Sequence, residues 1–189
     1  MAAPRTKIGV LALQGAYRLH KPHIEALSAQ YVEVISKSDF GTIDGIILPG
    51  GESGTMLKLI ETLGIEEVLR GFLQSKPTWG ICAGAILMAR TVLNPAQKSF
   101  GAIDIELERN AYGRQLDSAE EVIDHYLVSY IRAPKITGCG AEVKVAKRRD
   151  GKPTWVEHDR KMVTTFHPET NLKAPSPWHQ RFMEYCRMS

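Results

Sequence analysis

The sequence predicts an α/β fold, with an open, mostly parallel sheet flanked by helices and antiparallel strands in its later half. Short apolar runs alternate with helical patterns in the first half of the chain, and this alternation is typical of a parallel sheet covered on both faces. After residue 100, strand patterns separated by turn residues dominate. The 189 residues contain no Pro/Gly/Ser-rich linker, so we expect one domain over residues 1–189.

Four strands, with helices after them, are expected in the first half. The strands are expected at residues 7–13, 31–36, 44–51 and 77–82. Helical patterns lie around residues 23–30, 55–74 and 83–90, and Gly64 is expected to interrupt the second of them. Open parallel sheets bind ligands beyond the carboxyl ends of their strands. The segments 13–15, 49–51 and 80–82 are therefore expected to converge on one crevice.

The second half is expected to form strands and hairpins before a last helix closes the chain. Strand patterns occupy residues 101–108, 121–134, 141–158 and 161–167, and the helix is expected at residues 177–188. A basic run, Lys147-Arg148-Arg149, precedes Asp150-Gly151. A hairpin turn with a solvated basic rim explains this run.

The composition is that of an ordinary globular protein, with 43% hydrophobic and 24% charged residues. The net charge of +3 gives no reason to expect a nucleic-acid partner. No apolar run approaches the ~20 residues of a membrane span, and the first residues do not form a secretory leader. Three cysteines without a repeating spacing indicate neither a disulfide framework nor a metal site. We therefore expect a cytoplasmic protein with no membrane contact.

Cys82 stands between two glycines, in Gly80-Ile81-Cys82-Ala83-Gly84, where an expected strand meets an expected helix. This pattern is the thiol version of the nucleophile elbow, in which small neighbours permit a sharp turn that exposes the central side chain. The first turn of a helix also favours the thiolate form. The alternative is a buried cysteine that packs as a small apolar residue.

A nucleophilic cysteine needs a base, and His167 is the candidate among the six histidines. His20, His23 and His179 lie in or near helical patterns, His125 lies in a charged stretch and His158 follows a hairpin strand. His167 ends an apolar strand, with Glu169 two residues later. In an extended segment this spacing puts both side chains on one side, so Glu169 can orient the imidazole and stabilise its charged form.

An acyl-transfer site also needs donors for a developing oxyanion. The backbone N–H of Ala83, directly after the nucleophile, is one such donor. The turn Pro49-Gly50-Gly51-Glu52-Ser53 offers a second from Gly51, because glycine lets the backbone approach a ligand closely. A helix start capped by Ser53 or Thr55 is the alternative interpretation of this turn. No phosphate-binding glycine motif is present.

Six segments in order resemble the glutaminase subunit of pyridoxal 5′-phosphate synthase, a class I, triad-type glutamine amidotransferase with a flavodoxin-like fold. They are GVLALQGAYRLH, DGIILPGGESGTM, WGICAGAILMAR, ERNAYGRQLDS, YIRAP and FHPE, and the match runs from about residue 7 to 172. The elbow and His-x-Glu are shared by triad amidotransferases in general. The other motifs are narrower and indicate this subfamily.

The resemblance implies hydrolysis of L-glutamine to glutamate and ammonia through a thioester on Cys82, with His167 as base and then acid and Glu169 as the orienting acid. It also implies a set of residues that bind glutamine. These are Gly51, Glu52, Ser53, Arg109, Ile131 and Arg132. The chemistry agrees, because an arginine fork suits the α-carboxylate of glutamine. Surface ion pairs are the alternative for the two arginines.

The resemblance further implies a partner, the synthase subunit, in a large hetero-oligomer within which ammonia passes internally. Gln14 would lie beside the oxyanion region and face that partner. Neither a cofactor nor a metal is implied.

Several features depart from the usual family pattern. They are Gly54, Ile81, Leu19, the segment HPETN at residues 167–171 and a short segment between Asp117 and Tyr130. The substitutions at Gly54, Ile81 and Leu19 leave open a non-catalytic subunit with a docking or regulatory role. A triad amidotransferase that serves another synthase is a further alternative, although the segments 109–115 and 131–134 argue against it. A cysteine peptidase or redox thiol shares the elbow but does not explain the turn at residues 51–53.

Overall fold

The computed structural model describes residues 5–109 and 118–188, and a seven-stranded mixed sheet lies at its centre. The strand order is β10-β11-β12-β4-β3-β1-β2. The five strands from β12 to β2 are parallel, whereas β11 and β10 continue the sheet as antiparallel strands. The predicted fold class is confirmed, since the antiparallel strands come from the later half of the chain.

The large sheet is built from both ends of the sequence. Its strands are β1 (Lys7–Leu11), β2 (Gln30–Val34), β3 (Gly45–Leu48), β4 (Thr78–Ile81), β10 (Lys144–Arg149), β11 (Lys152–His158) and β12 (Lys161–Thr164). The helices are α1 (Lys21–Ala26), α2 (Ser53–Thr62), α3 (Glu66–Ser75), α4 (Ala83–Met88) and α5 (Pro177–Arg187). Short 3₁₀ helices are η1 (Tyr17–His20), η2 (Lys37–Thr42) and η3 (Pro168–Thr170). No helix in the described ranges is both long and apolar enough to cross a membrane.

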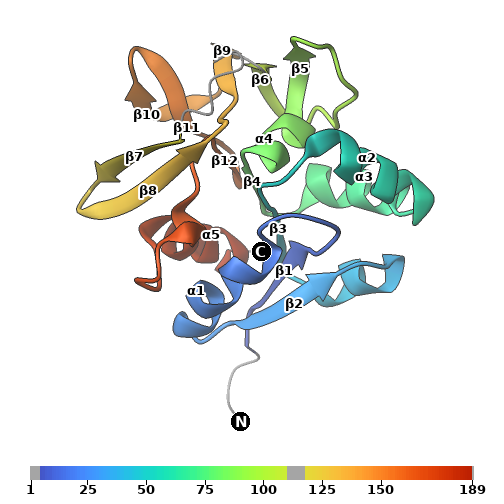
Figure 1. Cartoon of the computed structure of the whole chain (residues 1–189). Coiled ribbons are helices and arrows are strands. Elements are labelled where there is room, and N and C mark those ends of the chain that lie inside the picture. The colour runs from blue at the N-terminus through green and yellow to red at the C-terminus, as the bar shows by residue number, and fades with distance from the viewer. Residues whose placement is uncertain (1–4, 110–117, 189) are drawn as a thin grey trace.

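Helices cover both faces of the large sheet, and Figure 1 shows α1 and α5 on one side of the central strands and α2 and α3 on the other. Side chains alternate along each strand, so β3 sends Ile47 into one core and Ile46 and Leu48 into the other. The core under α5 contains Trp79 and Phe182, which are fully buried. Two apolar layers thus fix the sheet from both sides.

Two smaller sheets complete the fold. The first has the order β5-β6-β9 and uses β5 (Ala89–Leu93), β6 (Ile103–Glu108) and β9 (Lys135–Cys139). The second is the hairpin of β7 (Ser118–Ile123) and β8 (Tyr126–Ile131). Its two-residue turn, Asp124-His125, has positive φ at both positions (50° and 66°), the conformation that matches strand twist in tight hairpins.

Most expected elements are present, but several bounds differ and strands β5 and β9 are not expected from the sequence. The helix expected at residues 23–30 ends at Ala26, and Gln30 already begins β2. Gly64, at φ 63°, separates α2 from α3 as expected. The helix expected at residues 83–90 ends at Met88, because Ala89 is extended and begins β5. Strand β9 is not expected from the sequence as a separate element, since its residues, KITGC, lack a long apolar alternation.

Helix α4 passes unusually close to the neighbouring strands. A Cβ added to Gly84 would lie 1.9 Å from the carbonyl oxygen of Leu48 in β3. A Cβ added to Gly80 would lie 2.7 Å from the carbonyl oxygen of Gly84. Both contacts are with backbone, which cannot move aside cheaply. The two glycines that flank Cys82 therefore let the helix start directly against the sheet.

Gly84→Ala is predicted to destabilise the protein by about 2–3 kcal/mol, because the added methyl group overpacks a backbone contact. Gly71→Ala is the matched control, since a Cβ at Gly71 in α3 meets nothing within 4 Å. The control should gain about 0.5–1 kcal/mol from helix propensity. Urea unfolding of both variants measures the difference, and equal stabilities would contradict the close approach of α4.

Candidate active site

A cavity of about 410 Å³ opens where the carboxyl ends of β1, β3 and β4 meet. This volume is within the usual range for small-molecule sites. It is lined by Gln14, Gly15, Ala16, Leu19, Gly50, Gly51, Glu52, Ser53, Cys82, Ala83, Ile86, Arg109, Ile131, Arg132, His167 and Thr170. Every site residue predicted from the sequence lines this cavity except Glu169, which is buried behind His167.

Cys82 occupies a strained backbone conformation between β4 and α4, with φ 48° and ψ −100°. Non-glycine residues rarely adopt positive φ, and such strain gathers at functional sites. The turn is held from both sides, because the Cys82 N–H donates to the carbonyl of Thr164 (3.0 Å) and its carbonyl accepts from the Ile86 N–H (3.2 Å). The thiol faces the cavity edge and lies 3.8 Å from the carbonyl oxygen of Ile131. The elbow geometry predicted from the sequence is present.

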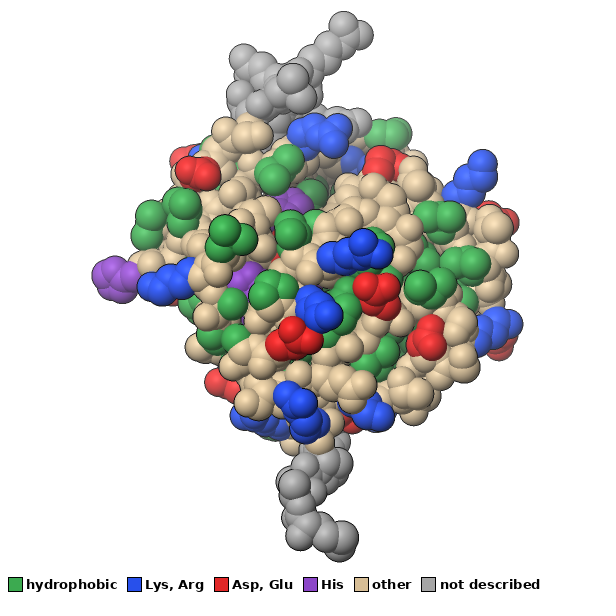
Figure 2. Space-filling model, turned by 60° about the horizontal axis from the view of Figure 1, so that its bottom comes forward, with side chains coloured by type: hydrophobic (Ala, Val, Ile, Leu, Met, Phe, Trp, Pro, Cys, Tyr) green, Lys and Arg blue, Asp and Glu red, His purple; other side chains and the backbone are tan. Residues whose placement is uncertain are grey.

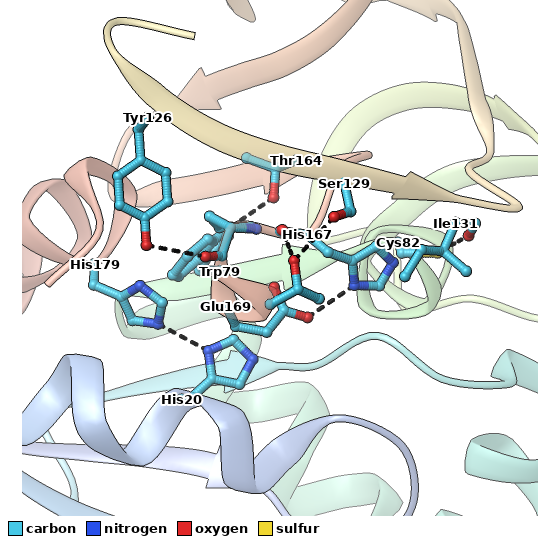
Figure 3. Close-up of polar contacts among 12 residues, drawn as sticks. His20, Trp79, Cys82, Tyr126, Ser129, Ile131, Thr164, His167, Glu169 and His179 are labelled. Carbon is cyan, nitrogen blue, oxygen red and sulfur yellow. Dashed lines mark hydrogen bonds and ion pairs between the residues drawn. The ribbon is translucent and has the colours of Figure 1, made fainter. Parts of the chain in front are cut away.

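His167 pairs with Glu169, and 2.8 Å separates the imidazole Nδ1 from a carboxylate oxygen. Figure 3 shows the His167 ring between Glu169 and Cys82. His167 itself is extended, but Glu169 lies in the 3₁₀ turn η3 rather than in the extended segment expected from the spacing of two. The turn still brings the two side chains together, and it buries Glu169 almost completely (2% exposed).

The β7–β8 hairpin fixes the backbone of His167. Ser129 in β8 exchanges two backbone hydrogen bonds with His167, at 2.7 and 3.4 Å. The Thr170 hydroxyl adds hydrogen bonds to the His167 carbonyl (3.0 Å) and the Ser129 hydroxyl (3.1 Å). Tyr126, at the start of β8, donates to the carbonyl of Lys173 at 2.8 Å. The hairpin therefore fixes the backbone of His167 through Ser129, and Tyr126 ties the segment after His167 to the same hairpin.

The charges in this group favour the ionised pair. Burial lowers the pKa of His167, but the neighbouring Cys82 and Glu169 outweigh it and raise this pKa to about 10. Burial raises the pKa of Glu169, but its hydrogen bond to His167 and the charge of that ring bring it below its ordinary value. Glu169 occupies Nδ1 of His167, so the buried Nε2 is the ring nitrogen left for proton transfer, and the interaction of the ring with Cys82 is part of what raises its pKa.

The backbone at Gly51 is oriented by the loop after β1. The carbonyl of Gly50 accepts a hydrogen bond from the Ala16 N–H at 3.1 Å. Because the peptide between Gly50 and Gly51 is trans, the Gly51 N–H points away from that loop. The Gln14 side chain accepts from the Glu52 N–H at 2.8 Å. Ala83 is the first residue of α4, where backbone N–H groups have no partner within the helix.

Glu52 caps α2, and neither Ser53 nor Thr55 does so, which corrects the cap considered from the sequence. Its carboxylate accepts from the N–H groups of Gly54 (3.0 Å) and Thr55 (2.6 Å). Hydrogen bonds with Thr55 are the main cause of the lowered pKa of Glu52, followed by Gly54 and the charge of Arg109. Arg109 lies 3.4 Å from the same carboxylate, and the Ser53 hydroxyl donates to Gln97 at 3.0 Å.

The remaining lining residues divide into expected and unexpected ones. Arg132, at φ 45°, directly follows β8 and reaches the cavity beside Ile131, as expected. Leu19, Ile86 and Thr170 are not predicted from the sequence to line it, although Thr170 follows the His-x-Glu motif. The predicted motif from Asn110 to Gln115 lies outside the described residues. Within residues 5–109 and 118–188, no group of three or more His, Cys, Asp or Glu could hold a metal ion.

Comparison with known proteins identifies the family. The SNO glutamine amidotransferase family matches residues 10–187. The chain belongs to this family. The amidotransferase resemblance predicted from the sequence is thereby confirmed.

Curated relatives and solved structures agree with this family. The pyridoxal 5′-phosphate synthase subunit PdxT of Koribacter versatilis is 45% identical over 187 residues, which cover 96% of each chain. The protein of the same name from Fervidobacterium nodosum is 40% identical over 184 residues, 94% of this chain and 95% of that one. A crystal structure of a glutamine amidotransferase is 35% identical, with a TM-score of 0.85 over 95% of this chain and 98% of the other.

A more distant structure shares the fold alone. It is a putative GMP synthase component from Thermoplasma acidophilum, which is 16% identical with a TM-score of 0.65 over 99% of this chain and 96% of that chain. The architecture of this amidotransferase is therefore retained where little of the sequence is.

The His167–Glu169 pair predicts a specific dependence of stability on pH. The raised His167 pKa contributes stability that is fully present below the ordinary value of 6.5 and is lost as the pH rises through about 10. Glu169→Gln removes the carboxylate that raises this pKa. The difference in unfolding free energy between wild type and Glu169→Gln should therefore be largest near pH 6 and shrink toward pH 10. Denaturant titrations at several pH values measure it, and a difference that grows with pH would contradict the pairing.

Proposed function

We propose that this chain is the glutaminase subunit of a pyridoxal 5′-phosphate synthase, which hydrolyses L-glutamine and delivers ammonia to a synthase subunit. One observation supports nucleophilic catalysis by a cysteine most directly. Cys82 sits in a strained elbow at the cavity, next to an imidazole that is paired with the buried carboxylate of Glu169. The names of the relatives support the assignment to vitamin B6 synthesis.

In the first step, the thiolate of Cys82 attacks the side-chain amide carbon of glutamine. The protonated His167 gives its proton to the departing nitrogen, ammonia leaves, and a glutamyl thioester remains on sulfur. In the second step, the now neutral His167 takes a proton from water. The resulting hydroxide attacks the thioester, glutamate leaves, and the thiolate is restored. Glu169 keeps the ring oriented and stabilises its charged form in both steps.

The tetrahedral intermediates carry an oxyanion that needs fixed donors. The Ala83 N–H, one residue after the nucleophile, and the Gly51 N–H are the proposed donors. Gly51 depends on the loop after β1, since Ala16 holds the Gly50 carbonyl and Gln14 holds the Glu52 N–H. A partner that contacts Gln14 would therefore act directly on the oxyanion site.

Glutamine is proposed to bind between the turn at residues 51–53 and the arginines. Arg132 lines the cavity and forms no ion pair with another described residue, whereas Arg109 lies beside Glu52. Arg132 is therefore the better candidate for the α-carboxylate of the substrate. Glu52 offers the anionic group for the α-ammonium, and the backbone of Ile131 lies next to the Cys82 sulfur.

The proposal includes the setting in which this site works. The chain would act as one amidotransferase domain over residues 1–189, in the cytoplasm and within a large hetero-oligomer with the synthase subunit. It would need neither metal nor cofactor. Figure 2 shows lysine and arginine side chains interspersed with acidic ones on the face in view, so that face carries no continuous basic patch of the kind that binds nucleic acid. Leu19, 44% exposed at the cavity rim, would contribute to the docking face.

Cys82→Ala is predicted to reduce glutamine-dependent ammonia release by at least about 10³-fold in the presence of the synthase subunit, because no nucleophile remains. Cys139→Ala is the control, since Cys139 is exposed in β9 and does not line the cavity. Coupled measurement of glutamate and ammonia with and without the partner decides the result.

Each other outcome of this assay has a defined meaning. Binding of the partner without any release by wild type would indicate a docking subunit instead of a glutaminase. Release that survives Cys82→Ala would remove the proposed nucleophile. If a different synthase alone stimulates ammonia release, the amidotransferase activity would be supported, but its assignment to vitamin B6 synthesis would be rejected.

Arg132→Met is predicted to raise the KM for glutamine by roughly 10- to 100-fold with a smaller effect on kcat, because the carboxylate of the bound substrate loses its charged partner. Arg90→Met is the matched control. Arg90 lies in β5 and pairs with Asp104 at 3.1 Å, outside the residues that line the cavity. An unchanged KM in Arg132→Met would assign carboxylate binding to another residue.

A further inference from the structure

A buried polar network lies behind Glu169, on the side away from the cavity. It consists of His20, His23, Ser176 and His179, each at most 1% exposed. His20 ends η1, His23 lies in α1, and Ser176 and His179 start α5. Four polar groups at complete burial are unusual, and none of them is used by the reaction described above.

The hydrogen bonds of this network determine which ring nitrogen carries each proton. The Ser176 hydroxyl accepts from the His179 backbone N–H (3.2 Å) and lies 2.6 Å from His179 Nδ1. Its own proton then goes to Nδ1, since no other acceptor is in reach among the described residues. A neutral His179 with an accepting Nδ1 carries its proton on Nε2.

The proton position on His179 determines that on His20. His179 Nε2 lies 2.9 Å from His20 Nδ1, so the proton on His179 Nε2 is donated to His20 Nδ1. Because His20 Nδ1 accepts, a neutral His20 carries its proton on Nε2. The remaining ring, His23, is anchored separately, because its Nδ1 accepts from the Ser176 N–H at 3.1 Å.

Two buried polar atoms at the end of this chain of hydrogen bonds have no hydrogen-bond partner among the described residues, and they belong to two side chains whose charges interact. They are His20 Nε2 and the second carboxylate oxygen of Glu169. Figure 3 shows the His20 ring beside the Glu169 side chain, with His179 on its other side. A buried donor and a buried acceptor that are both left unsatisfied would be costly. The Nε2–H of His20 can donate a hydrogen bond, and the second carboxylate oxygen of Glu169 can accept it.

We propose that His20 is a positioning residue that donates its Nε2–H to the second carboxylate oxygen of Glu169, with its tautomer set by Ser176 through His179. Glu169 then has both oxygens held, one by His167 and one by His20. The carboxylate can neither rotate nor leave His167. His20 does not touch the substrate; it acts through Glu169 on the base.

Neutral rings are required for this arrangement, and the surroundings favour them. Burial is the main cause that lowers the pKa of His20 to about 4 and that holds the pKa of His179 well below its ordinary value. The titratable groups that face Glu169 are His167, His20, His23 and Tyr126. Among them, His167 makes the ionised pair with Glu169.

The tautomers can be measured directly in the unmodified full chain, without any reaction. Long-range ¹H–¹⁵N NMR spectra distinguish Nδ1–H from Nε2–H rings. The proposal predicts the Nε2–H form for both His20 and His179 between pH 6 and 8. A Nδ1–H form, or a doubly protonated ring, at His20 would overturn it.

Variants test the effect on the base, in the complex with the synthase subunit. His20→Leu removes the donor and should lower kcat by roughly 10- to 100-fold with KM for glutamine nearly unchanged. The acid limb of the kcat/KM profile should move to higher pH, because Glu169 loses a bond that favours its charged form. His20→Gln, whose amide nitrogen can replace Nε2, should recover most of the rate and the profile.

His158→Gln is the matched control, since its ring contacts the Glu142 carbonyl (3.0 Å) away from this network. An unshifted acid limb in folded His20→Leu would overturn the proposal, and so would equal losses in His20→Leu and His20→Gln. The inference deepens the proposed function, but the two fail separately. If the wild-type complex releases no ammonia, the proposed glutaminase function is rejected. The NMR spectra of the full chain would still show whether His20 and His179 are in the Nε2–H form.

Discussion

The backbone turn at Cys82 is the constraint on which the rest of the site depends. Its positive φ costs about 1–3 kcal/mol, and the chain keeps it because the surroundings leave no alternative. Gly84 lies against the Leu48 carbonyl with no room for a side chain, and the Cys82 N–H is bound to Thr164 in the adjacent strand β12. Relaxing the turn would separate α4 from the sheet. The thiol is therefore placed by packing that involves three parallel strands.

Residues far apart in sequence complete the site around that thiol. The loops after β1 and β3 form the oxyanion side, and the β7–β8 hairpin holds His167 through Ser129. The N-terminal η1 and the C-terminal α5 meet behind Glu169, where His20 and His179 are in contact. Both ends of the chain thus support one carboxylate. A substitution of His179 in α5 can for this reason affect the reaction on the other side of Glu169.

The sequence is sufficient to predict the sheet and most residues that line the cavity. Strand ends in a parallel sheet converge, so the positions of Gln14, Gly51 and Cys82 follow from strand periodicity alone. Strand β9 and the end of α4 at Met88 could not be predicted, because tertiary pairing decides them. The same limit applies to the Glu52 cap, since several residues near a helix start can accept its N–H groups.

The histidine network shows the same limit more clearly. In sequence, His20, His23 and His179 have helical neighbours and no motif, and nothing relates them to one another or to Glu169. Their contacts exist only because α1 and α5 cover the same face of the sheet. Contacts between polar side chains that lie far apart in the sequence leave no pattern in the residues around each of them. Only the folded arrangement, together with the count of donors and acceptors, reveals what they hold in place.

The central claim is covalent catalysis at Cys82, and acid-quenched mass spectrometry of the complex during glutamine turnover tests it most directly. A glutamyl adduct is expected on the peptide that contains Cys82, absent without glutamine and lost again after glutamine is exhausted. Ammonia release with no adduct on that peptide under rapid quenching, or with an adduct on the peptide of Cys139 or Cys186 instead, would contradict it.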